Sequence, residues 1–158
     1  MVTDKLEKVI DKAKNDILAI AVQLVQETID NYVNDLHSYM GLEAGETGYS
    51  DREVSWAPLD LESDQDSKFW YESGTTAGNI VSKVVVDGNK IYAMAGLPSE
   101  SEGYKEALWN EFGWSPHGSS KIVRRALFVP LSEYHLRELN ILLQERIGTI
   151  KMKIRIKL

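Results

Sequence analysis

The sequence predicts one α+β domain over residues 1–158, with a small, mainly antiparallel sheet between a long first helix and a later one. Three observations predict this class. Apolar residues recur at helical spacing along residues 1–40, a β-hairpin pattern follows an acidic loop region at residues 41–76, and helical spacing returns near the carboxy end. Hydrophobic residues make up 43% of the chain and charged residues 27%, as in ordinary globular domains with one core.

The first forty residues have the pattern of one long helix. Asp4 and Glu7 form a capping box, apolar residues follow at steps of three and four, and Gly41 supplies a stop. Such a helix would be roughly 55 Å long at about 1.5 Å per residue, which is more than a small domain covers. Three outcomes are open: the helix lies on its own sheet, it breaks near residues 31–34, or its apolar stripe packs on another copy of the chain.

Residues 41–76 are predicted to be a solvated acidic loop region that suits a basic partner. Within it, Asp60, Glu62, Asp64 and Asp66 alternate as calcium or magnesium ligands do. The glycine and the later glutamate of an EF-hand loop are missing at the required positions. We therefore expect no bound metal here.

Residues 77–148 are predicted to be the α+β core. Residues 80–86 and 90–95 are rich in β-branched residues and flank Asp87-Gly88, a strong hairpin-turn signal. A short helix is expected over residues 102–112, with Tyr104, Leu108 and Phe112 on its apolar face. A second helix over residues 130–148 begins with proline, ends with glycine and is expected to pack on the sheet.

Residues 149–158 alternate strictly between apolar and basic residues, which predicts a final β-strand. Its basic face carries four cations: Lys151, Lys153, Arg155 and Lys157. These cations either keep an exposed strand soluble or meet an acidic surface, such as the acidic loop of a neighbouring copy or passing DNA.

No catalytic grouping stands out. The chain has no cysteine, and none of His37, His117 and His135 stands at a motif spacing from an acid and a nucleophile. We therefore expect no enzyme activity, no catalytic or cofactor-binding residues, and no cofactor. The net charge of −6 disfavours broad nucleic-acid binding. The absence of a long apolar run, and of a signal-peptide core in residues 1–20, predicts a cytosolic chain without a membrane partner.

Several short motifs carry a family resemblance. They are Ala57-Pro58-Leu59-Asp60, then Glu111-Phe112-Gly113, then the run from Arg125 through Pro130 to Leu131. Their order, with the long first helix, resembles tailed-bacteriophage tail-completion or neck proteins, the head–tail joining proteins of lambdoid type. The chain departs from the family pattern at Ala126, at Leu127-Phe128 and at Trp114, and the basic strand has no counterpart.

The resemblance implies a structural virion protein that forms a homo-oligomeric ring, as a hexamer, in the neck or tail. Its partners would be portal–connector proteins (adaptor and stopper) on one side and tail terminator or tail tube proteins on the other. DNA would at most pass through the lumen, and viral assembly would take place in the host cytoplasm. The motif residues would be scaffold: Gly113 and Pro130 at turns, Phe112 in the core, and Arg125 paired with Glu111.

Interface anchors are expected among the aromatic residues. Trp109 and Trp114 are the main candidates, with Trp70 and Tyr71 beside them. Two other classes of function are open. One is a protein-interaction module with the same core that forms no virion ring, and the other is a metal-dependent hydrolase that uses Asp60, Asp64 and Asp66.

Overall fold

The computed structural model describes residues 2–40, 47–49, 70–72, 75–112 and 127–147. It confirms the α+β class with a long first helix, an antiparallel hairpin and a later helix. In chain order the elements are α1 (Val2–Met40), β1 (Thr47–Tyr49), β2 (Trp70–Glu72), α2 (Thr75–Gly78), β3 (Val81–Asp87), β4 (Lys90–Gly96), α3 (Tyr104–Phe112) and α4 (Phe128–Ile147).

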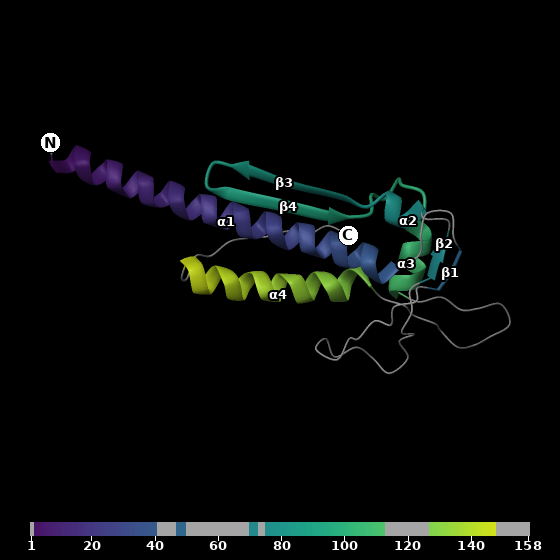
Figure 1. Cartoon of the computed structure of the whole chain (residues 1–158). Helices are drawn as coiled ribbons and strands as arrows, with labels where there is room; N and C mark the ends of the chain where they lie inside the picture. The colour runs from purple at the N-terminus through teal and green to yellow at the C-terminus, as the bar shows by residue number, and fades with distance from the viewer. Residues whose placement is uncertain (1, 41–46, 50–69, 73–74, 113–126, 148–158) are drawn as a thin grey trace.

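Helix α1 is one unbroken helix of 39 residues (Figure 1). The alternative of a break near residues 31–34 is therefore wrong. Tyr32 lies in that stretch and is completely buried, and its side chain reaches the start of α4. Packing at Tyr32 outweighs the low helix propensity of the asparagines beside it.

Helix α1 also forms the middle layer of the molecule, with the β3–β4 hairpin on one side and α4 on the other (Figure 1). Our expectation that the later helix packs on the sheet is wrong, because α4 packs on α1. A two-stranded hairpin has one narrow inward face, and α1 already covers it. The core therefore collects around the carboxy-terminal half of α1; its largest fully buried side chains are Tyr32, Ile29, Leu36, Leu127, Leu139, Val25 and Pro130.

The hairpin pairs β3 with β4 antiparallel, and Asp87 opposite Lys90 is the last pair before the turn. The loop therefore consists of Gly88 and Asn89, one residue later than the sequence predicted. Gly88 has a φ of +59°, a conformation that glycine adopts without steric cost. Along β4 the side chains alternate strictly: Ile91, Ala93 and Ala95 are buried against α1, and Tyr92 and Met94 are exposed.

The region expected to be an acidic loop contributes short elements. Strands β1 and β2 pair antiparallel, and α2 follows them. Gly103 lets α3 approach α2 closely, because a Cβ at this position would lie 2.6 Å from the Thr76 hydroxyl and the φ of Gly103 is +86°. The final strand predicted at residues 149–158 lies outside the described residues.

Candidate assembly surfaces

Glu111 occupies the last turn of α3, and its side chain is buried, with 3% of its surface exposed. Three backbone N–H groups donate to its carboxylate. The N–H groups of Leu127 and Phe128 donate to Oε2 at 2.8 and 2.9 Å, and that of Val129 donates to Oε1 at 2.8 Å. Glu111 is therefore the amino-terminal cap of α4, although 16 residues separate it from Leu127.

The next two residues, Pro130 and Leu131, leave no unpaired backbone donor in the first turn of α4. Pro130 has no N–H group, and the N–H of Leu131 donates to the Leu127 carbonyl at 3.2 Å. Every backbone donor from residue 127 to residue 131 therefore has a partner. The negative charge of Glu111 also lies where the dipole of α4 is positive, which adds a favourable electrostatic interaction.

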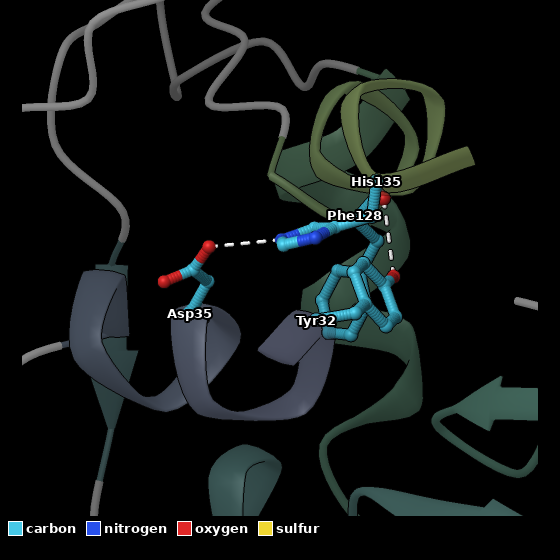
Figure 2. A network of polar contacts seen from close by, with 4 residues as sticks. All are labelled: Tyr32, Asp35, Phe128 and His135. Carbon is cyan, nitrogen blue, oxygen red and sulfur yellow. Dashed lines mark hydrogen bonds and ion pairs between the residues drawn. The ribbon is translucent and has the colours of Figure 1, made fainter. Parts of the chain in front are cut away.

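Tyr32 ties α1 to the same helix start. Its hydroxyl donates to the Phe128 carbonyl oxygen at 3.1 Å, as Figure 2 shows. Burial raises the pKa of the Tyr32 hydroxyl, and the negative charge of Glu111 raises it further. The hydroxyl is thus held neutral as a hydrogen-bond donor.

A second polar contact joins α1 and α4 one turn further along. His135 Nε2 lies 2.8 Å from Asp35 Oδ2 (Figure 2). The imidazole packs edge-on against the rings of Tyr32 and Tyr134. These contacts hold one helix against the other. Within the described part of the chain, no group of three or more His, Cys, Asp or Glu residues is placed to hold a metal ion.

The outer face of α3 is apolar and exposed. Trp109 exposes 55% of its surface and Phe112 exposes 67%, so our expectation that Phe112 lies in the core is wrong. The residues that face inward are Ala107 and Glu111, because Glu111 must reach α4, and this turns Phe112 outward. Phe112, Leu108 and Phe128 are among the residues that line a mostly apolar hollow of about 180 Å³.

Most of the other residues singled out from the sequence lie outside the described residues. They are Ala57, Pro58, Asp60, Asp64, Asp66, Gly113, Trp114, Arg125, Lys151, Lys153, Arg155 and Lys157. The pairing of Arg125 with Glu111 therefore stays a prediction. Trp70 and Tyr71 belong to β2, and Pro130 lies in the first turn of α4, as expected.

Sequence reasoning missed the capping role of Glu111, although a signal was present. Leu127 stands where a helix usually has Ser, Thr, Asp or Asn, and leucine cannot accept a hydrogen bond from the first turn. A helix start without a local cap, followed by proline, indicates that a distant acceptor supplies the cap.

The chain matches no protein-family model, no curated protein and no solved structure. Of the helices in the described ranges, none has the length and apolar character that crossing a membrane requires.

Proposed function

We propose that this protein is a structural component of a tailed-phage virion, which forms a ring at the head–tail interface and joins the portal–connector complex to the tail. The observation that carries the proposal is the cap of α4. Glu111 comes from the Glu-Phe-Gly segment. The backbone N–H groups that donate hydrogen bonds to it come from the segment that runs to Pro130 and Leu131. Two of the motifs on which the resemblance rests thus form one buried structural unit, which supports their role as scaffold.

The exposed surfaces are consistent with assembly. A closed ring of identical copies needs two complementary faces on each subunit. The outer face of α3, with Trp109 and Phe112, is one candidate face. The outer face of the hairpin, with Val85, Tyr92 and Met94, is a second one on a different element (Figure 1). Exposed aromatic side chains are frequent anchors of protein interfaces.

The test is complementation of a phage that lacks the gene. We expect the deletion to leave separate heads and tails in electron micrographs, and the wild-type gene to restore joined particles. Trp109→Glu and Phe112→Glu should restore few joined particles, because each places a charge on a surface that assembly would bury. Lys105→Glu is the matched control, since it changes charge at an exposed position of the same helix.

The gene deletion tests the proposed function, and the point variants test which surfaces form the interface. Joined particles at normal yield after deletion of the gene would contradict the proposed function. If both α3 variants still give joined particles at normal yield, the outer face of α3 is not the assembly interface. Truncation after Gly148, and replacement of the four cations of residues 149–158 by Glu, test the basic segment in the same assay. Binding of a cellular partner without any ring would favour the interaction-module alternative.

A further inference from the structure

The amino-terminal half of α1 has an apolar stripe that the described residues leave exposed. Leu6 exposes 59% of its surface, and Val9 at the side of the stripe exposes 64%. The stripe residues are spaced alternately by four and three positions, which is the pattern of a coiled-coil seam. They are Leu6, Ile10, Ala13, Ile17 and Ile20, and the next step of four reaches the buried Leu24.

The stripe continues the face of α1 that α4 covers. From Leu24 the same face runs through Thr28 to Tyr32 and Asp35, and both of the latter contact α4. Helix α4 runs antiparallel to α1 and ends at Ile147, and α1 extends well past this end and past the hairpin turn (Figure 1). Among the described residues, the exposed stripe is thus an uncovered extension of an existing helix–helix interface.

We propose that residues 3–20 bind the same segment of a second copy as a two-fold antiparallel coiled coil. In this register Leu6 lies opposite Ile17 of the second copy, and Ile10 lies opposite Ala13. The helix of the second copy would then continue the path and direction of α4 along α1. The proposal goes beyond ring formation at the head–tail interface and does not depend on it.

The charges of the segment favour a second copy over an anionic membrane. Residues 4–16 contain four acidic and four basic side chains, so the segment is neutral while the whole chain carries −6. The acidic residues are Asp4, Glu7, Asp11 and Asp16, and the basic ones are Lys5, Lys8, Lys12 and Lys14. An amphipathic helix that binds anionic membranes has a basic polar face, which this segment lacks. Two neutral segments of mixed charge do not repel one another.

Two charged residues beside the seam select the antiparallel orientation. Glu7 and Lys14 flank it at equivalent heptad positions, so in the antiparallel register each Glu7 comes close to Lys14 of the second copy. A parallel pair would instead place Val9 beside Lys14 and Asp16 beside Ala21, without any pair of opposite charges. The segment is also helical before it binds, because the buried half of α1 nucleates it, and a preformed helix loses little entropy on docking.

The first experiment is sedimentation of the purified full chain over a concentration series. We expect a dimer in reversible equilibrium with the monomer. Ile17→Asp should raise the dissociation constant by more than about tenfold, because it would bury a charge in the seam. Asn15→Asp, which adds the same charge on the opposite face of α1, should leave it unchanged. A chain that stays monomeric at every concentration, or a dimer that Ile17→Asp leaves intact, would overturn the proposal.

The second experiment tests orientation. Glu7→Lys and Lys14→Glu should each weaken the dimer, and the double variant should restore it. Because the chain has no cysteine, single introduced thiols report contacts cleanly. Leu6→Cys together with Ile17→Cys should form an intersubunit disulfide; these positions lie about 16 Å apart along one helix, which excludes an internal bond. A disulfide formed by Leu6→Cys alone would indicate a parallel pair and contradict the register.

These readouts are independent of virion assembly. Dimerisation is measured on the purified protein, and head–tail joining is measured on particles. A dimer that depends on Ile17, found in a protein whose deletion leaves joined particles, would support the coiled coil and contradict the proposed function. If joined particles require the gene but the purified protein is always monomeric, the proposed function is supported and the coiled coil is contradicted.

Discussion

The two halves of α1 have the same periodicity and opposite surroundings. From Leu24 onward most of its apolar residues are buried, and up to Ile20 the apolar stripe is exposed in the described structure. The three-and-four spacing of apolar residues determines which face of a helix is apolar, whereas the length of the neighbouring elements determines how much of that face is covered. Helix α4 has 20 residues and α1 has 39, so α4 cannot cover the whole face.

The largest expected effect comes from one substitution made in both halves. Leu36→Ala should lower the free energy of unfolding by about 2–5 kcal/mol, because Leu36 is fully buried and its loss leaves a cavity. Leu6→Ala, the same change in the exposed half, should change it by less than about 0.5 kcal/mol in the monomer. Urea denaturation at low protein concentration measures both. Equal losses would mean that the projecting half is part of the folding core.

The next largest effect concerns the cap of α4, the helix that covers the buried half of α1. Glu111→Gln should cost about 2–3 kcal/mol, because the amide group turns one acceptor into a donor that faces backbone N–H groups in a buried site. Glu138→Gln, at an exposed position of α4, is the matched control. Thermal unfolding followed by circular dichroism compares the two. A loss no greater than that of the control would show that other groups can cap α4.

Alkaline pH offers a third test through Tyr32. Burial and the charge of Glu111 raise the pKa of its hydroxyl in the folded protein, whereas in the unfolded chain it ionises near its usual value of about 10. The unfolded state therefore loses a proton first as pH rises. Stability should fall by about 1.4 kcal/mol per pH unit above pH ~10 on account of this residue.

Tyr32→Phe isolates that contribution, because it removes the titrating hydroxyl and keeps the ring. Its stability should decline less steeply than that of the wild type in urea titrations above pH ~10. Parallel declines for the two proteins would show that Tyr32 ionises equally easily in the folded and unfolded states.

The smallest effect concerns the contact of Asp35 with His135. Asp35→Asn should cost at most about 1 kcal/mol at neutral pH, because more than a third of the Asp35 side chain is exposed and water screens its charge. Denaturation of the variant at low and high salt would measure it. A loss as large as that of Glu111→Gln would mean that this contact carries more of the α1–α4 interface than its exposure indicates.

The sequence predicted most elements because their signals are local. The spacing of apolar residues predicted α1, β-branched residues around a turn signal predicted the hairpin, and Pro130 marked the first turn of α4. The orientation of α3 could not be predicted in this way. Its inward position belongs to Glu111, which is buried through bonds to the start of a helix 16 residues later, and periodicity contains no information about that contact.

Local sequence signals also could not predict which element α4 packs on, or how far α1 extends beyond its neighbours. The spacing of Leu131, Leu139 and Leu143 shows that α4 has an apolar face, but not whether a sheet or a helix covers it. That outcome depends on how much of the hairpin face remains after α1 has packed there. Most of the candidate surface residues lie outside the described residues, so their place in the fold stays a prediction, whereas Trp109 is exposed.

The cap at Glu111 also has a consequence for engineering. Its hydrogen bonds fix the end of α3 next to the start of α4, so both ends of the connection between them are held together. The entropy cost of lengthening a connection whose ends are fixed grows only with the logarithm of its length, about 0.6 kcal/mol for each doubling. We therefore expect a peptide tag inserted between Phe112 and Leu127 to add little loop-closure entropy cost, and such a tag would report the position of this subunit in an assembled particle.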